Sequence, residues 1–559
     1  MLLAIPLILS GFTHLWNPIE FPSLHIDEGH YMRKTMSILE GTGLDPLARY
    51  AAPYFGQIFL AGVLAIVGYP DSLNPSDGDD VLHSVQTLYL VPRVLMGLLA
   101  VVDTFLIYKI TERRYHNRNV ALIAAILFAV MPYGWLFRRV FLETIQVPFL
   151  LTSILFAVYL KDLKIENNYN TIRYKTILMI LLSGTFLGLS IFTKIPVFTI
   201  IPAIGFLIYT NNTNGHKLRN LGIWLIPVLV IPLIWPAHAM LIGEFDLWMN
   251  GVLWQTTERP SRPLIGTINT FFEMDPVLFV LSMAGLIFAA VRRDFFLLLW
   301  VIPFLIFLHV IDYVSSFHLI PLLPAFSIAS SRFIVEITNK IIKKNKLHQI
   351  LPISIISGIV IFGLISTTML ITTNVNSSVY KALAVIIPKL PDKDDTNNTA
   401  SVTLVGAPTY FWLPRYAFDK AFDEKSYFSG KPLENERYIV IADRGLMRIM
   451  SGTDNRPPNP LMQYLYENSQ TIDRVIPDDE TKYNVKKYPY VNMLQNPRST
   501  EIEIRSNGED STGNNNNDNN DNSAASMTAS SNNNNTIITD ETPNLGETGD
   551  ILSDLKLTP

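Results

Sequence analysis

Long apolar segments recur along the first two thirds of the chain, and charged residues gather at their ends. An α-helix needs about 20 apolar residues to cross the hydrocarbon core of a bilayer, so these segments predict transmembrane helices. Prolines inside them, such as Pro92 and Pro227, are tolerated because neighbouring helices satisfy the freed backbone groups. The pattern predicts an α-helical polytopic membrane protein with about eleven transmembrane helices. The predicted spans are 2–16, 91–110, 119–136, 141–160, 176–193, 195–210, 221–240, 276–291, 295–311, 318–336 and 350–371.

One further apolar stretch, YFGQIFLAGVLAIVG at 54–68, decides the orientation of everything after it. It is short for a membrane span, and we expect it to form a juxtamembrane helix along the surface. The basic loops between the later spans then all fall on one side, which their Lys and Arg content identifies as the cytoplasm. These loops are KITERRYHNR, KDLKIENNYNTIRYK, HKLR, Arg292–Arg293 and KIIKKNK. If the stretch crossed the membrane, these charges would face outward.

The predicted topology places the amino terminus in the cytoplasm and residues 17–90 in one large outer loop. The other predicted outer segments are 138–143, the turn at Lys194, 241–275, 312–318 and the chain after residue 372. The first span is short, and a cleavable signal peptide is an alternative interpretation of it. A start codon assigned too far downstream would explain its shortness equally well.

After residue 372 the hydrophobic pattern changes. ASVTLVGAPTYFWLPR at 400–415 and RYIVIAD at 437–443 contain short apolar runs typical of buried strands. We expect a transmembrane domain at 1–372, a small α/β extracytoplasmic domain at 373–505, and a disordered Asn-, Ser- and Asp-rich tail at 506–559. N-x-[ST] triplets begin at Asn376, Asn397 and Asn534, which suits an outer location, whereas the triplet at Asn211 would be cytoplasmic.

Composition narrows the classes of function. The chain has 559 residues, of which 49% are apolar and 16% charged, and its net charge of -4 includes no basic domain for nucleic acid. It has no cysteine, which excludes disulfides, thiolate metal sites and a cysteine nucleophile.

The stretch PSLHIDEGHYMRK follows the first span and places Asp27 and Glu28 side by side between two histidines. Such a pair can cap a helix or balance nearby basic residues. A second set of charges, however, is predicted at the same depth: Arg93, Arg138, Arg139, Glu143, Lys194 and His318. Charges near a bilayer core are costly, so this gathering predicts a shared polar cavity at the outer leaflet. Cations there can hold a phosphate, and a carboxylate can remove a proton from a hydroxyl.

The order of the motifs is also informative. DE-x-x-Y, ending at Tyr31, is followed by a stretch with Gly41, Gly43, Pro53 and Gly56, and then by Pro-Arg at the second span. PYGWLFRRVFLE, GTFLGLSIFTK and FHLIPLLPAFSI come after it. This order resembles the GT-C fold, and in particular the family 39 glycosyltransferases, the group of protein O-mannosyltransferases and aminoarabinose transferases. The resemblance covers about residues 1–372.

Two positions depart from the family's pattern. The family usually has His-Pro-Pro where this chain has Ala51, Ala52 and Pro53, which puts substrate contacts on that loop in doubt. Glu143 stands where Asp is more frequent, which is a chemically mild change. The C-terminal domain matches nothing in the family's pattern.

The resemblance implies a GT-C catalytic domain that moves a sugar from a polyprenyl-phosphate donor to a hydroxyl of a protein, lipid or glycan, with inversion. Asp27 would deprotonate the acceptor, and Glu28 or Glu143 would orient Asp27 or bind a divalent cation. The donor phosphate would be bound by Arg93, Arg138, Arg139, Lys194 and His318. Tyr31 and Pro53 would belong to the substrate loop.

Each assignment has a structural alternative. Arg93 and Lys194 stand at helix ends, where basic residues are often interfacial anchors, and His318 alone is typical of a structural hydrogen bond. The run HIDEGH is a candidate metal site, but it lacks the i, i+4 His pair of zinc hydrolases.

The alternative function is transport, because Asp103 in VVDTF falls near the middle of a predicted span. Against transport, nearly all other charges collect at span ends, and the sequence shows no internal repeat with paired broken helices.

Overall fold

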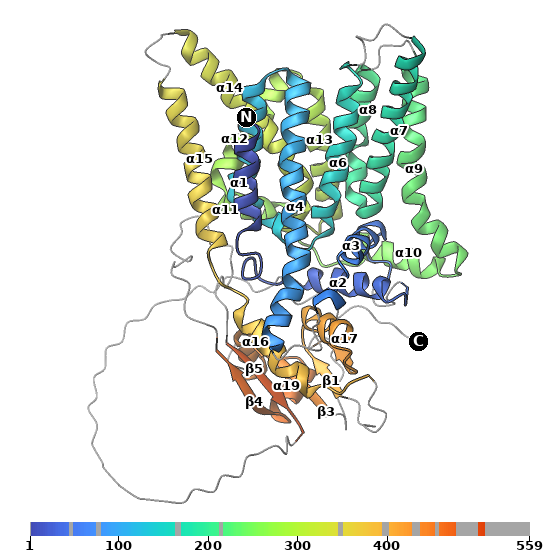
Figure 1. Cartoon of the computed structure of the whole chain (residues 1–559), viewed down its shortest axis with the longest axis vertical. Coiled ribbons are helices and arrows are strands. Elements are labelled where there is room, and N and C mark those ends of the chain that lie inside the picture. The colour runs from blue at the N-terminus through green and yellow to red at the C-terminus, as the bar shows by residue number, and fades with distance from the viewer. Residues whose placement is uncertain are drawn as a thin grey trace, which may run out of the picture.

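A helical bundle and a smaller domain with a β-sheet at one end make up the protein (Figure 1). The computed structural model describes residues 2–43, 49–73, 80–162, 169–211, 216–344, 350–393, 402–426, 437–452, 458–476 and 501–508. Most of the predicted tail, from residue 509 onward, therefore lies outside the described residues, as do the triplets at Asn397 and Asn534.

Every predicted span coincides with helix. The bundle helices are α1 (Ala4–Leu15), α4 (Val81–Tyr115), α5 (Arg118–Val130), α6 (Leu142–Tyr159), α7 (Tyr169–Thr193), α8 (Ile201–Asn211), α9 (Lys217–Leu241), α12 (Pro276–Val291), α13 (Phe295–Ile311), α14 (Leu323–Lys344) and α15 (Ile350–Ile371). Short 3-10 segments lead into or extend three of them: η2 (Pro132–Arg138), η4 (Ile195–Ile200) and η6 (Ser316–Leu322). A further one, η1 (Asp71–Leu73), follows α3 (Phe55–Ile66) in the chain.

The number of membrane crossings is smaller than predicted when length and hydropathy are applied strictly. Among the described residues, 6 helices are long and apolar enough to cross a membrane, or up to 8 if each bent pair counts as one span. The bent pairs are α5 with η2, at 69°, and α11 (Leu264–Met274) with α12, at 117°. Both bends fall at a proline, which cannot donate the next helical hydrogen bond. The count of eleven is therefore not confirmed.

The stretch 54–68 forms a short helix, α3 (Phe55–Ile66), beside α2 (Ile26–Leu39) and α10 (Phe245–Leu253) at one end of the bundle. Figure 1 shows these three helices lying across the direction of the long helices, which agrees with the predicted juxtamembrane position of α3. The carboxyl ends of α4, α8, α12 and α14 lie at the opposite end, together with the amino terminus (Figure 1). The described helix ends next to the basic segments thus share one end of the bundle, and which side of the membrane this end faces stays a prediction.

Close helix packing accounts for the glycines of the GTFLGLSIFTK motif. A Cβ atom at Gly184 would lie 2.4 Å from the carbonyl oxygen of Trp224, and one at Gly188 would lie 2.5 Å from that of Pro227. The two glycines let α7 and α9 approach closely, which fixes the end of α7 directly before Lys194.

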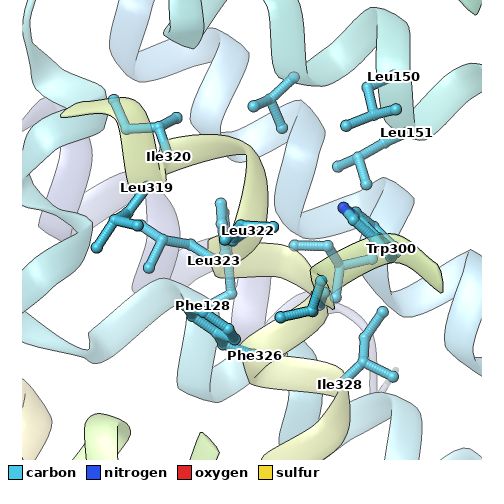
Figure 2. Packing of buried hydrophobic residues seen from close by; sticks show 14 of the residues in the cluster. Phe128, Leu150, Leu151, Trp300, Leu319, Ile320, Leu322, Leu323, Phe326 and Ile328 are labelled. Atoms are coloured by element: carbon cyan, nitrogen blue, oxygen red, sulfur yellow. The ribbon is translucent and has the colours of Figure 1, made fainter. Parts of the chain in front are cut away.

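The bundle core is apolar and continuous across several helices. Figure 2 shows Phe128 of α5, Leu150 and Leu151 of α6, Trp300 of α13 and Phe326 of α14 packed together. Removal of this apolar surface from water and lipid, with close packing, holds the long helices in fixed positions.

The C-terminal domain contains a mixed five-stranded sheet in the order β2-β1-β3-β5-β4. Its strands are β1 (Val402–Val405), β2 (Asp423–Lys425), β3 (Arg437–Asp443), β4 (Gln470–Val475) and β5 (Ile502–Ser506). Strands β2, β1 and β3 are parallel, and β5 is antiparallel to β3 and β4. The other elements of this part are α16 (Ser377–Ile386), η8 (Ile387–Lys389), η9 (Pro408–Tyr410), α17 (Trp412–Ala417), α18 (Arg444–Met450) and α19 (Pro460–Glu467).

The predicted strands are partly right. RYIVIAD coincides with β3, but only the first part of 400–415 is a strand, because Pro408 and Pro414 lack the N–H groups that a sheet requires. Strand β5 ends at Ser506, which the prediction had placed in the tail.

Two of the predicted N-x-[ST] sites are buried. The Asn376 side chain donates to the carbonyl oxygens of Ile19, Glu20 and Pro22 and is 1% exposed. Asn211 donates to the Ala157 carbonyl at 2.9 Å. Both asparagines therefore have structural roles in this fold.

Candidate active site

Helix α2 begins with a cap built from the HIDE sequence. Its N-cap residue is His25, whose Nδ1 accepts a hydrogen bond from the Asp27 N–H at 3.2 Å. Glu28 Oε2 accepts a hydrogen bond from the His25 N–H at 2.9 Å. These two bonds satisfy backbone donors that the first turn leaves free, and they start the helix directly before Asp27.

Glu28 points into the protein and pairs with Arg93 of α4. Arg93 Nη2 lies 2.9 Å from Glu28 Oε2, Arg93 Nε lies 3.2 Å from Oε1, and the Val140 N–H donates to Oε1 at 3.1 Å. Burial alone would raise the pKa of Glu28, but Arg93 and these hydrogen bonds lower it by more. Arg93 Nη1 also donates to the carbonyl oxygens of Pro18, Ile19 and Pro22. The pair therefore ties α2 to α4 and to the loop before α2.

Asp27 points in a different direction, and its side chain is 18% exposed. Burial alone would raise the pKa of Asp27, but the charges around it, from His25, Lys194, His30 and Arg259, lower it by more. His25 contributes only in acid, because burial lowers the pKa of His25 to about 4. At neutral pH, Asp27 is thus an ionised carboxylate that interacts electrostatically with Lys194 and Arg259.

Lys194 lies at the break between α7 and η4, where Pro196 prevents the helix from continuing. Its Nζ pairs with Glu143 in the first turn of α6 and lies 5.0 Å from the ring centre of Phe317. The His25 ring contacts the same phenylalanine at 5.8 Å. Phe317 therefore brings Lys194 to the beginning of α2.

Arg259 was missed by the sequence reasoning. It follows η5 (Trp254–Glu258), and its guanidinium lies 4.8 Å from the ring centre of Trp254 and 4.4 Å from that of Tyr313. Backbone hydrogen bonds of Arg262 to Asp312 and Val314 hold this loop against the one that precedes η6. Arg259 interacts electrostatically with Asp27 and Tyr31, and within the described chain its Nε has no hydrogen-bond partner.

Tyr31 lies on α2 one helical turn after Asp27 and interacts electrostatically with Asp27, Glu143 and Arg259. Burial raises its pKa well above the usual value, so Tyr31 is a neutral hydroxyl at physiological pH. We call His25, Asp27, Tyr31, Lys194 and Arg259 together the Asp27 cluster.

Three other predicted residues lie next to this cluster. Arg139 Nη2 donates to Ser23 Oγ at 2.9 Å, and its guanidinium stacks on Trp135 at 4.7 Å. His318 interacts electrostatically with Lys194 and Arg259, and its Nδ1 accepts the Ser315 N–H at 2.9 Å. Glu143 reaches the cluster through its ion pair with Lys194.

Arg138 and Pro53 are placed elsewhere. Arg138 is fully buried and donates to the carbonyl oxygens of Thr13 and Trp16, so it caps the carboxyl end of α1. Pro53 is buried directly before α3.

Asp103 is also buried, about 15 Å further along α4 than Arg93. Neither carboxylate oxygen of Asp103 has a hydrogen-bond partner in the described part of the chain.

The proposed divalent-cation ligands do not fit one metal site. The oxygens of Glu28 accept hydrogen bonds from Arg93 and backbone N–H groups, and Glu143 Oε1 pairs with Lys194. Across the described ranges, no group of three His, Asp or Glu side chains is arranged to bind a metal ion. No step of the chemistry proposed below uses a metal.

Comparisons with known proteins agree on the fold. A family model described as dolichyl-phosphate-mannose-protein mannosyltransferase matches residues 81–239. Comparison with curated protein sequences gave no match. The chain has the fold of an Archaeoglobus fulgidus oligosaccharyltransferase tethered with an acceptor peptide that contains the NVT sequon (TM-score 0.55, 11% identity, 80% of this chain and 69% of that chain).

Two further structures were solved with lipid phosphates. One is the oligosaccharyltransferase AglB of Archaeoglobus fulgidus in complex with an inhibitory peptide and a dolichol-phosphate (TM-score 0.54, 12% identity, 80% of this chain and 69% of that chain). The other is ArnT from Cupriavidus metallidurans bound to undecaprenyl phosphate (TM-score 0.50, 10% identity, 91% of this chain and 98% of that chain).

The family model and the fold together define the class. The protein is a membrane glycosyltransferase with the GT-C fold. This confirms the resemblance that the order of sequence motifs indicated.

Proposed function

We propose that the protein transfers a sugar from a polyprenyl-phosphate donor to a hydroxyl acceptor on a protein, lipid or glycan, with inversion at the anomeric carbon. The observation that carries this proposal is the position of an ionised carboxylate, Asp27, beside Lys194 and Arg259 in a chain of this fold. The lipid phosphates in AglB and ArnT support a donor of the same chemical kind.

Asp27 is the base in this proposal. The acceptor oxygen forms a bond to the anomeric carbon while its proton passes to a carboxylate oxygen of Asp27. The lowered pKa of Asp27 makes it a weak base, so the proton moves late, as the new carbon–oxygen bond makes the acceptor hydroxyl more acidic. Tyr31, a neutral hydroxyl on the same face of α2, is placed to hydrogen-bond the sugar or the acceptor.

Lys194 and Arg259 bind the donor phosphate. The bond between the anomeric carbon and the phosphate oxygen breaks, and its electron pair leaves with the polyprenyl phosphate. Fixed cations beside that oxygen stabilise the charge that develops on it. Glu143 holds the Lys194 ammonium in place, and Arg139 and His318 border the same region. Glu28, Arg93 and Arg138 are assigned to the support of the fold instead.

The proposed reaction takes place at the extracytoplasmic face. Helix α2, α3 and the C-terminal domain occupy one end of the bundle, and the described helix ends next to the basic segments occupy the other (Figure 1). The positive-inside rule assigns the basic end to the cytoplasm, which places the amino terminus inside and the Asp27 cluster outside. The predicted polar cavity around the cluster remains a prediction.

The deciding experiment compares Asp27→Asn with Asp103→Asn in membranes supplied with a panel of polyprenyl-phosphate sugars. Transfer should be abolished in Asp27→Asn, with the protein still folded, and should persist in Asp103→Asn. Full transfer by Asp27→Asn contradicts the proposal. Loss of function only in Asp103→Asn, measured as uptake into vesicles, would support the transporter alternative, because Asp103 has no place in the transfer chemistry.

A further inference from the structure

Two faces of helix α2 contact different parts of the protein. Successive residues of an α-helix are turned by about 100°, so Tyr31 lies about 40° from Asp27, whereas Arg33 and Met36 lie about 120° and about 180° from it. The first face belongs to the Asp27 cluster. The second face is turned toward the C-terminal domain, because α2 contacts η9 and α17 and Arg33 pairs with Glu424 of β2.

The contact with the C-terminal domain begins with apolar packing. Met32 and Met36 are each 1% exposed and belong to the same buried cluster as Phe411 and Trp412, at the start of α17. Tyr89 of α4 extends this contact, since its hydroxyl donates to the Thr409 carbonyl at 2.7 Å. Apolar packing holds the surfaces together, but it leaves a short helix free to slide or rotate slightly.

An ion pair fixes the position of α2 within this contact. Arg33 Nη1 pairs with Glu424 Oε2 of β2, and Arg415 Nε lies 2.8 Å from Glu424 Oε1. The Arg33 and Glu424 side chains are 15% and 12% exposed, so water screens the pair only weakly. A charge-assisted bond of this kind sets direction and distance, which apolar contacts do not.

The C-terminal part also holds the loop that leads into α2. The Tyr380 hydroxyl donates to the Ile19 carbonyl at 2.7 Å, and Asn376 Oδ1 accepts the Leu24 N–H at 3.0 Å. The segment that carries Asp27 is therefore held by residues from α16 before the helix and by β2 along it.

We propose that the C-terminal domain positions the base of the reaction, and that Glu424 is the positioning residue that does so through Arg33. This inference rests on the proposed function, because it needs Asp27 to be the base. Arg33 lies six residues after Asp27, about 9 Å along the helix axis and about 120° around it. A shift of α2 at Arg33 therefore moves the Asp27 carboxylate relative to Lys194 at the end of α7 and Arg259 in the loop after η5.

The test uses the full-length protein and compares Glu424→Gln and Arg33→Gln with Lys393→Gln. Lys393 pairs with Glu40 at the far end of α2 (3.8 Å) and with Asp419 (3.2 Å), and its side chain is 39% exposed. The Lys393–Glu40 pair spans the same interface between α2 and the C-terminal domain, but an exposed ion pair of this kind contributes little to stability. We expect Glu424→Gln and Arg33→Gln to lower kcat about tenfold to a hundredfold, because small misplacements of a reacting group have effects of that size. Lys393→Gln should leave kcat unchanged.

Two measurements separate positioning from a general loss of structure. The rate is expressed per bound polyprenyl phosphate, so unfolded protein does not count. The chain has no cysteine, so a bifunctional thiol reagent reacts with an Arg33→Cys, Glu424→Cys double variant only at these two positions. Cross-linking should restore most of the lost kcat, because it replaces the ion pair by a covalent tether.

The outcomes are distinct. Unchanged kcat in Glu424→Gln, while Asp27→Asn is inactive, overturns the positioning role and leaves the proposed function intact. A loss of kcat that the cross-link does not restore also overturns it, since the charge and not the position would then matter. If Asp27→Asn keeps full activity, the proposed function itself has failed.

Discussion

Replacement of Glu28 by Gln tests whether the two neighbouring acids have separate roles. Glu28 accepts four hydrogen bonds, two from Arg93 and one each from the N–H groups of His25 and Val140. The Glu28 and Arg93 side chains are 3% and 1% exposed. Gln keeps the size of the side chain, but it leaves the Arg93 guanidinium buried without a counter-charge and turns an NH₂ group toward a donor.

The expected magnitude follows from the loss of one partner of a buried ion pair, which costs about 3–5 kcal/mol. Domains are stable by only about 5–15 kcal/mol, so Glu28→Gln should lower the unfolding temperature by several degrees. Asp27→Asn should change it little, because the Asp27 side chain is 18% exposed and lies 3.9 Å from its His25 partner. The two variants should therefore have different defects: Glu28→Gln should lose stability, and Asp27→Asn should lose turnover.

The assay is thermal unfolding of purified protein in detergent, followed at several pH values. The folded-state pKa of Glu28 lies below its ordinary value of 4.5, so its stabilisation is complete above pH 4.5 and is lost as the pH falls through the folded-state value. Glu28→Gln should remove this pH dependence. A double variant with Arg93→Met should recover only part of the stability, because the loop carbonyls that Arg93 binds then lose their donor. An unchanged unfolding temperature in Glu28→Gln would refute the structural role and return Glu28 to the candidates for catalysis.

Further predictions concern single positions. Lys194→Ala should lower kcat about a hundredfold to a thousandfold and weaken inhibition by free polyprenyl phosphate, measured by steady-state kinetics. Neither His25 nor Asp27 should give the rate an acid limb above about pH 4, because the pKa of His25 falls to about 4 and that of Asp27 lies below its usual value; a limb near pH 6.5 that Asp27→Glu shifts would contradict this. Asn376→Ala should destabilise the protein by about 2 kcal/mol or more through the loss of its hydrogen bonds, and mass spectrometry should find no glycan on the wild-type Asn376. Asp103→Asn should keep transfer activity, and a loss of transfer with normal folding would contradict the proposed site.

Hydrophobic periodicity was enough to predict the helical bundle and a separate short helix within 54–68. Both are properties of long segments, in which many residues contribute to one signal. The direction of a single side chain is a different kind of property. Asp27 and Glu28 are neighbours in sequence, yet one joins the cluster and the other a buried ion pair, because adjacent helical residues point about 100° apart.

Adjacent arginines show the same limit. Arg138 and Arg139 follow the bend at Pro132, and one caps α1 while the other stacks beside the cluster. Arg259 lies in TTERPSRP, where prolines and polar residues give no periodic pattern to read. The sequence does place Arg259 in a predicted outer segment, 241–275. A basic residue in such a segment is as good a candidate for phosphate binding as a basic residue at a helix end.

The charges of the assembled site explain why the acids are divided in this way. Glu28 neutralises Arg93 inside the fold, and Glu143 neutralises Lys194 in part, which leaves Asp27 facing an excess of positive charge from Lys194 and Arg259. A polyprenyl-phosphate sugar is a phosphodiester with one negative charge, and the departing phosphate gains a second as the bond to the sugar breaks. When Asp27 takes the acceptor proton, its own negative charge disappears at the same stage. The positive charge that had balanced the carboxylate then balances the phosphate, so the total charge within the site stays constant while the sugar moves.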